Sequence, residues 1–91
     1  MAKLDLSNKL KEKRKKIDLI DQKLLNLLNQ RLSIALETGK IKKEMEKKAY
    51  DPQREKEVLE RLKLKNRGPL KGEDLERIFK MIIRICRKAQ T

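Results

Sequence analysis

The chain has 91 residues and a net charge of +12, from 26 Lys and Arg against 14 Asp and Glu, and it contains no His. This length suggests one small domain, and the lack of His excludes both a His base and a His metal ligand. The single cysteine, Cys86, cannot form an intrachain disulfide and suits a reducing compartment. No apolar run approaches the length of a membrane span, so a soluble cytoplasmic protein is expected.

The first stretch, about residues 6–46, predicts one very long amphipathic helix. It contains no Pro, and its only Gly is Gly39. At 1.5 Å per residue it would be roughly 60 Å long, about twice the diameter of a compact chain of this size. Its apolar seam would either be exposed to solvent or be covered by a second copy of the chain; the second alternative is favoured, and a symmetric homodimer is expected. The seam consists of Leu10, Ile17, Leu24, Leu28 and Ala35.

Three cations, Arg14, Arg31 and Lys42, share this seam, and because burying an unpaired cation is costly they indicate an anionic partner. Arg31 and Lys42 are about 16 Å apart along the helix, close enough for their long side chains to converge on a small anion. Arg14 lies about 25 Å before Arg31 and cannot reach the same ligand within one chain. In antiparallel helices that cross near residue 25, the partner's Arg14 would lie opposite residue 36. This geometry predicts two identical pockets per dimer.

Two shorter helices are expected after the long one. Asp51 is a good N-cap and Pro52 suits the first helical position, so a second helix is expected over about 52–65. Asn66-Arg67-Gly68-Pro69 is a clear break, and a third helix is expected over about 72–90. Gln90 shares a face with Phe79 on that helix. The fold class is therefore all-α, with three helices per chain. The apolar stripe of the third helix is Leu75, Phe79, Ile82, Ile83 and Cys86.

The order and spacing of several short motifs resemble the all-helical class of chorismate mutases. The resemblance covers about Leu10 to Gln90, essentially the whole chain. It implies a chorismate mutase domain over residues 1–91, either alone or fused to prephenate dehydratase, that forms an intertwined homodimer and uses no cofactor or metal. The motifs are Leu10…Arg14-x-x-Ile17-Asp18-x-x-Asp21, Leu24-Leu25-x-Leu27-Leu28-x-x-Arg31, Gly39-Lys40-x-Lys42, Asp51-Pro52-x-Arg54-Glu55, Asn66-x-Gly68-Pro69-Leu70 and Ile78-Phe79-x-x-Ile82-Ile83…Gln90.

The same resemblance implies roles at the two carboxylates and the ether oxygen of chorismate. Arg31 and the partner's Arg14 would bind the carboxylates. Lys42 would contact the ether oxygen and one carboxylate, and Gln90 would also donate to the ether oxygen. This set agrees with the spacing of the seam cations, which was obtained from the helix geometry alone.

The resemblance implies a second group of residues around the ring hydroxyl. Glu55 would bind that hydroxyl, assisted by the Asp51 backbone, and Arg54 would be a further arginine lining the pocket. Cys86 stands where some relatives have a Ser that contacts a carboxylate. It is therefore a weaker candidate for substrate binding.

Two other functions fit parts of the sequence. Related helical proteins eliminate pyruvate from isochorismate in a similar cationic pocket, and sequence separates the two activities poorly. A basic module that binds nucleic acid or a partner helix would use the cationic run at residues 9–16. Against nucleic acid, Tyr50 and Phe79 are the only aromatic residues that could stack on bases. Chorismate, as a small dianion, is the expected partner.

Overall fold

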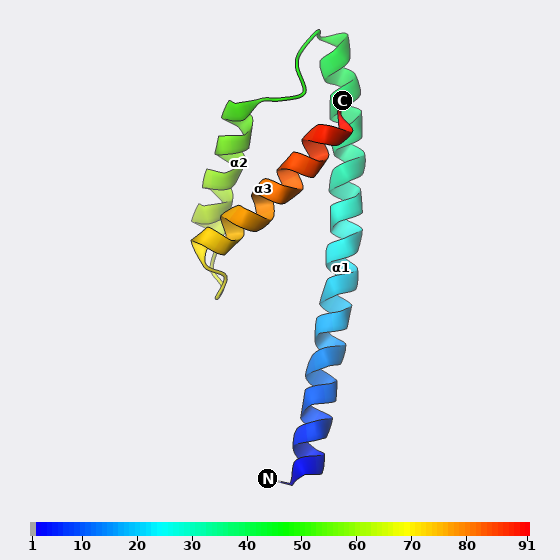
Figure 1. The fold of residues 1–91 in the computed structure, drawn as a ribbon, viewed down its shortest axis with the longest axis vertical. Helices are drawn as coiled ribbons and strands as arrows, with labels where there is room; N and C mark the ends of the chain where they lie inside the picture. The colour runs from blue at the N-terminus through cyan, green and yellow to red at the C-terminus, as the bar shows by residue number, and fades with distance from the viewer. Residues whose placement is uncertain (1) are drawn as a thin grey trace. The chain divides into compact units, whose positions relative to one another are not determined.

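A computed structural model describes residues 2–91 and consists of three helices, α1 (Lys3–Glu44), α2 (Pro52–Lys65) and α3 (Gly72–Ala89) (Figure 1). The described residues contain no strand. The prediction of an all-α fold with three helices is therefore confirmed. The chain divides into two compact units, residues 2–30 and residues 31–91, and each is described by itself.

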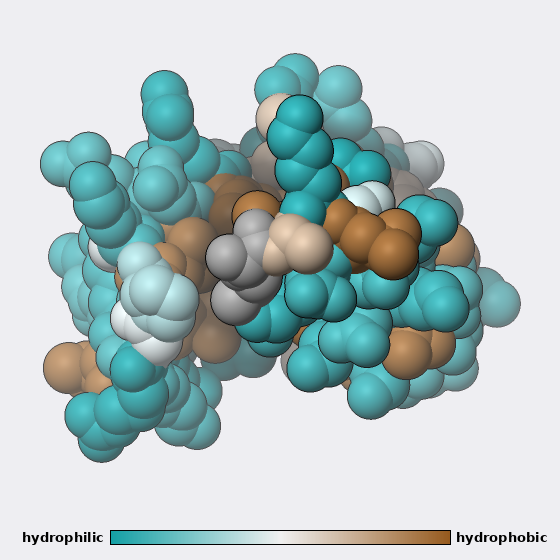
Figure 2. Space-filling model, turned by 90° about the horizontal axis from the view of Figure 1, so that it is seen from below, coloured by the Kyte–Doolittle hydropathy of each residue, from teal (hydrophilic) through white to brown (hydrophobic). Residues whose placement is uncertain are grey.

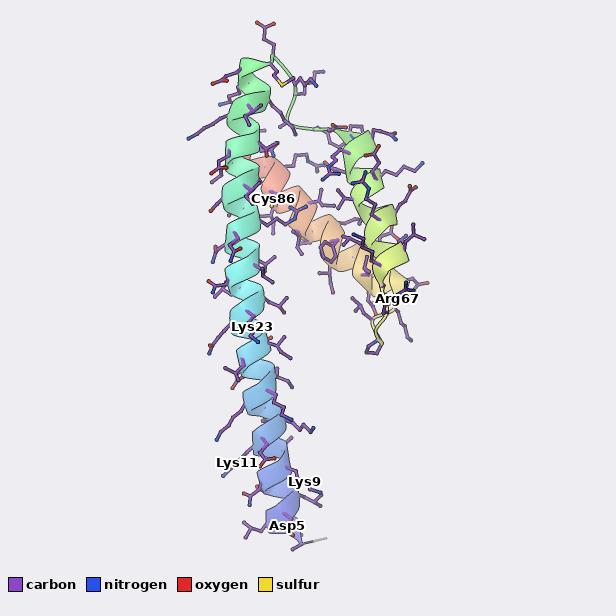
Figure 3. All side chains as sticks on the ribbon, turned by 180° about the vertical axis from the view of Figure 1, so that it is seen from behind. Asp5, Lys9, Lys11, Lys23, Arg67 and Cys86 are labelled. Atoms are coloured by element: carbon purple, nitrogen blue, oxygen red, sulfur yellow. The ribbon has the colours of Figure 1, made fainter. Side chains whose placement is uncertain are left out.

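The N-terminal unit is the first part of α1, in which every residue from Lys3 to Gln30 is exposed. Figure 3 shows side chains leaving this helix in all directions, among them the labelled Lys9, Lys11 and Lys23. The part of the predicted seam that lies in this unit is uncovered in the single chain, since Ile17 remains 55% exposed and Leu24 51% exposed.

Helix α1 starts earlier than the sequence suggested, at Lys3 instead of about residue 6. The backbone N–H groups of Asp5 and Leu6 both donate to the Ala2 carbonyl, at 3.1 and 3.2 Å. This carbonyl therefore begins the hydrogen-bonded ladder of the helix.

Helix α1 ends at Glu44 in a turn that contains a residue with left-handed backbone geometry. Glu46 has φ of 58°, the positive φ that is most easily adopted by Gly. Its N–H donates to the Lys43 carbonyl at 3.1 Å, and the Lys47 N–H donates to the Lys42 carbonyl at 2.7 Å. These two bonds form the Schellman motif, which satisfies the last carbonyls of the helix. The chain then turns toward α2.

Helix α2 starts as its sequence predicted. The Asp51 side chain caps it by accepting a hydrogen bond from the Arg54 N–H at 3.0 Å. Pro52 occupies the first helical position, where its missing N–H leaves no backbone bond unmade. The cap matters for the site because it fixes the first turn of α2, which carries Arg54 and Glu55.

The C-terminal unit has a small apolar core. Helix α3 supplies Leu75, Ile83 and Cys86, and the last part of α1 supplies Ala35 and Gly39. Phe79 and Ile82, the other members of the predicted stripe on α3, are half-buried. Three apolar residues of α2 are also half-buried; they are Val58, Leu59 and Leu62.

Three charged side chains, those of Glu76, Lys63 and Lys80, form a cluster that connects α2 to α3. The Glu76 carboxylate accepts from Lys63 of α2 and lies within 3.0 Å of Lys80, one turn further along α3. The hydrogen bonds and charges of Lys80 and Lys63 lower the pKa of Glu76 below its usual value. The cluster is at the surface, so solvent screening keeps its contribution to stability small.

The surface is dominated by charged residues. Figure 2 shows mostly hydrophilic side chains on the face viewed, with separate hydrophobic areas between them. Within residues 2–91, none of the helices has a stretch that is sufficiently long and apolar to cross a membrane.

Candidate active site

A pocket of about 320 Å³ lies within the C-terminal unit, a size suited to a small organic ligand. Its walls come from the last turns of α1, the segment that follows them, the first turns of α2 and the last turns of α3. Apolar atoms come from its aliphatic residues and polar atoms from charged side chains. The lining residues are Arg31, Ile34, Ala35, Thr38, Lys42, Ala49, Asp51, Arg54, Glu55, Val58, Ile83, Cys86, Arg87 and Gln90.

Lys42 and Gln90 meet at one end of the pocket. The Lys42 ammonium donates to Gln90 Oε1 at 3.0 Å and to the Ala49 carbonyl at 2.8 Å. An ammonium group can only donate, so the amide oxygen of Gln90 must face Lys42. The Gln90 NH₂ group is then left as a donor, and Lys42 has a third N–H to offer. Two donors from different elements are thereby held at the same end of the pocket.

This meeting depends on Gly39. A Cβ atom built at Gly39 would lie 2.9 Å from Cγ, 3.0 Å from Cβ and 3.1 Å from Cα of Gln90. Only a residue without a side chain therefore allows the end of α3 to approach α1 this closely. Gln90 is the C-cap of α3, and its backbone N–H donates to the carbonyls of Arg87 and Lys88. Although Gln90 is the penultimate residue of the chain, it is held by both its backbone and its side chain.

A second polar group lies where α2 and α3 face each other. The Arg87 guanidinium donates through Nη1 to both oxygens of the Glu55 carboxylate, at 2.8 and 2.9 Å. The same guanidinium lies over the Tyr50 ring, with its Cζ atom 4.7 Å from the ring centroid, the geometry of a cation–π interaction. Both members of the ion pair are partly buried. Glu55 is thus already paired within the chain before any ligand binds.

The remaining predicted residues occupy different parts of the pocket wall. Arg31 is half-buried on α1, whereas Arg54 and Asp51 are exposed at the start of α2. Cys86 is buried on α3 and carries a free thiol. Figure 3 shows Cys86 on the last part of α3, beside the C-terminal part of α1. Its small apolar surroundings suit a packing role as well as a contact with a ligand.

Arg14 is the one predicted site residue that does not line this pocket. It lies in the exposed N-terminal unit, on the first part of α1. The other predicted residues, Lys42, Gln90, Glu55, Arg31, Arg54, Asp51 and Cys86, all line the pocket. Their roles toward a ligand remain predictions.

Sequence reasoning missed Arg87. It is a basic residue in the last turn of α3, where a cation is favourable to the helix dipole and is ordinarily solvated. Its spacing in the sequence could have indicated a role in the pocket. Arg87 comes four residues after Ile83 and three before Gln90, so all three share one face of α3. A charge on the apolar face of a short helix indicates a partner.

The charges of the lining residues suit a ligand with two negative charges. Four cationic side chains and two carboxylates line the pocket, which leaves a net formal charge of +2. Within residues 2–91, no group of three or more His, Cys, Asp or Glu side chains is placed to hold a metal ion. The arrangement can bind carboxylates through its arginines and stabilise developing negative charge through Lys42 and Gln90. Fold and site together define an all-helical protein with a pocket of net positive charge.

Comparison with known proteins identifies the family. The family model for chorismate mutase type II matches residues 13–91, and the chain belongs to this family. It is 38% identical over 81 residues, 85% of its length, to the bifunctional chorismate mutase/prephenate dehydratase of Aquifex aeolicus. The chain spans about a fifth of the length of the bifunctional relatives it matches.

Solved structures of the same family share the fold. A Thermus thermophilus chorismate mutase superposes with a TM-score of 0.88 at 30% identity, over 90% of this chain and 93% of that chain. A Helicobacter pylori chorismate mutase, solved in complex with prephenate, superposes with a TM-score of 0.84 at 38% identity, over 91% of this chain and 90% of that chain.

Proposed function

We propose that this chain catalyses the rearrangement of chorismate to prephenate, as the mutase domain of aromatic amino-acid biosynthesis. The observation that supports this most directly is the pairing of Lys42 with Gln90 at one end of a pocket that also contains Arg31. A family member solved with prephenate and the family assignment of residues 13–91 support the same substrate class.

The chemistry needs only groups that this pocket contains. The reaction is a unimolecular Claisen rearrangement, in which an ether C–O bond breaks while a C–C bond forms within the same molecule. It requires no nucleophile, redox partner or net proton transfer. The enzyme must hold a flexible dianion in a folded conformer and stabilise the negative charge that grows on the ether oxygen.

The pocket side chains have different roles in this reaction because their chemistry differs. Arg31 presents a planar guanidinium that suits a carboxylate, whereas the Lys42 ammonium is a compact charge that can reach a single oxygen. Gln90 contributes its NH₂ group, which is directed away from Lys42 by the hydrogen bond to its carbonyl oxygen. In this proposal Lys42 and Gln90 both donate to the ether oxygen. Glu55 accepts from the ring hydroxyl, and Arg54, the Asp51 backbone and Cys86 complete the wall.

We further propose that the active form is an antiparallel homodimer in which the partner's Arg14 completes each pocket. The support is the exposed seam of the N-terminal unit, which combines Arg14 with half-exposed leucine and isoleucine side chains. Contiguous apolar surface of this kind is usually covered in solution. A cytoplasmic location is proposed for the same protein, supported by a lone cysteine that suits a reducing compartment.

The test of the activity compares Lys42→Ala with Lys43→Ala. Purified protein is mixed with chorismate, and the loss of its ultraviolet absorbance is followed, with prephenate confirmed by acid conversion to phenylpyruvate. Removal of the Lys42 donor should lower kcat about 10²–10³-fold. Lys43 is exposed in the same last turn of α1, so Lys43→Ala should retain full activity. A folded wild-type protein that leaves chorismate unchanged but releases pyruvate from isochorismate would overturn the proposal.

The test of the shared pocket mixes two inactive variants. Arg14→Ala and Lys42→Ala remove residues that would serve one pocket from different chains. A heterodimer of the two therefore has one pocket with both changes and one with neither. After complete exchange of equal amounts, about half of the dimers are heterodimers with one intact pocket each, so about a quarter of the wild-type activity should return. A stable folded monomer in sedimentation, or no recovery after proven exchange, would contradict the proposal.

A further inference from the structure

One of the two carboxylates that line the pocket, that of Glu55, is already paired with a cation of the same chain. Glu55 projects from the first turn of α2, and Arg87 reaches it from the last turn of α3, with Nη1 at 2.8 and 2.9 Å from the two carboxylate oxygens. The Arg87 side chain is 30% exposed and the Glu55 side chain is 24% exposed, so water only partly screens this ion pair. The pair is therefore less screened than an ion pair between fully exposed side chains.

An unpaired carboxylate would be unfavourable in this pocket. The proposed substrate carries two carboxylates, and Glu55 must lie near it to accept a hydrogen bond from its hydroxyl group. Without a neighbouring cation, the charge of Glu55 would repel the ligand that its own oxygen is meant to bind. Arg87 offsets that charge while leaving each Glu55 oxygen a lone pair with which to accept another hydrogen bond.

The Arg87 guanidinium is itself held in place. It lies over the Tyr50 ring, 4.7 Å from its centroid, and Tyr50 belongs to the segment just before α2. An arginine fixed on one side by a ring and on the other by a carboxylate loses little further freedom when a ligand binds. Three segments of the C-terminal unit thus combine to orient one carboxylate toward the pocket.

We propose that Arg87 is a positioning residue for Glu55: it neutralises this carboxylate and holds it so that Glu55 recognises the substrate hydroxyl without repelling the substrate carboxylates. The inference rests on the proposed function and adds to it a residue that acts through another side chain. Its main consequence concerns substrate binding, because the uncompensated charge would act on the bound dianion throughout the reaction.

The experiment measures KM and kcat for chorismate in a double-mutant cycle of Arg87→Met and Glu55→Gln. Arg87→Met should raise KM by roughly 10-fold, as expected for one uncompensated charge at a half-exposed site, with a smaller effect on kcat. Adding Glu55→Gln to Arg87→Met should lower KM again, because the neutral amide no longer repels the substrate. Arg87→Lys should retain most of the wild-type KM, since it keeps the charge. Arg84→Met removes one cation from an exposed position of α3 and should leave KM unchanged.

The outcomes separate this role from others. If the double variant binds chorismate no better than Arg87→Met, Arg87 contacts the substrate directly or only supports the fold, and the positioning role is wrong. Circular dichroism of each variant identifies a loss of fold, and a folded double variant with a recovered KM supports the proposal. Wild-type turnover is measured first. An inactive, folded wild-type protein would refute the proposed function and with it this role, whereas an active wild type without recovery would refute only the role of Arg87.

Discussion

Replacing Gly39 by Ala tests whether close approach of α3 to α1 builds the catalytic end of the pocket. The added Cβ would lie 2.9 Å from Cγ and 3.1 Å from Cα of Gln90. Carbon atoms prefer separations of about 3.5–4.0 Å, so the end of α3 must move by roughly 0.5–1 Å. Rotation of the Gln90 side chain cannot remove the clash, because one of the close atoms belongs to the backbone.

The displacement acts directly on the hydrogen bond between Lys42 and Gln90. Its present length is 3.0 Å, and an added 0.5–1 Å would take it beyond the usual range for a hydrogen bond. The Gln90 amide would then be free to rotate away from the ether oxygen. Misplacement of this size lowers rates by up to about 10²-fold, so kcat/KM should fall about 10- to 100-fold.

Stability should change less than activity. Ala favours a helix interior by about 1 kcal/mol over Gly, whereas overpacking costs about 1–3 kcal/mol. The net loss in the free energy of unfolding is therefore about 0–2 kcal/mol, measured by urea denaturation. Gly72→Ala is the matched control, because a Cβ there meets nothing within 4 Å, and it should leave kcat/KM unchanged. A Gly39→Ala protein with wild-type kcat/KM and a raised free energy of unfolding would refute the reasoning.

The other predictions concern stability. Glu46 has φ of 58°, so Glu46→Gly should raise the free energy of unfolding by about 0.5–1 kcal/mol without changing kcat. Urea denaturation measures this, and a lowered free energy of unfolding would contradict the Schellman assignment. Asp51 caps α2, so Asp51→Ala should lower the free energy of unfolding by about 1 kcal/mol, whereas Asp51→Asn should largely preserve it. Equal losses in the two variants would show that the charge of Asp51 stabilises the helix and that its capping hydrogen bond does not. Lys80 and Lys63 lower the pKa of Glu76 from its ordinary value of 4.5, so its stabilising effect is present above that pH and is lost as pH falls through the lowered pKa. Glu76→Gln should therefore be less stable than wild type at pH 7, and the difference in urea midpoint should shrink in acid; a constant difference would exclude this linkage.

The local chemistry of the sequence was enough to predict the helices and several pocket residues. Helix existence follows from propensity, periodicity and breakers, which act over a few residues, so the break at residues 66–69 and the Asp51-Pro52 start could be recognised directly. Arg31 and Lys42 could be chosen for the same reason, because their spacing on one helix follows from 1.5 Å per residue. The start of α1 was missed by three residues, since terminal turns depend on weak bonds that have no clear sequence signal.

Contacts between helices required the tertiary structure. Nothing near Arg87 in the sequence shows that it pairs with Glu55, because the two residues are 32 positions apart and meet only through the angle at which α3 packs on α2. From the sequence, Gly39 would be interpreted only as a residue that weakens the helix. The structure shows that its missing side chain leaves the space that Gln90 occupies. Sequence by itself determined which helices form and which charges share a face, since those depend on neighbouring residues. Only the tertiary structure decided which side chains from different helices touch, because distances between helices depend on the packing of the whole unit.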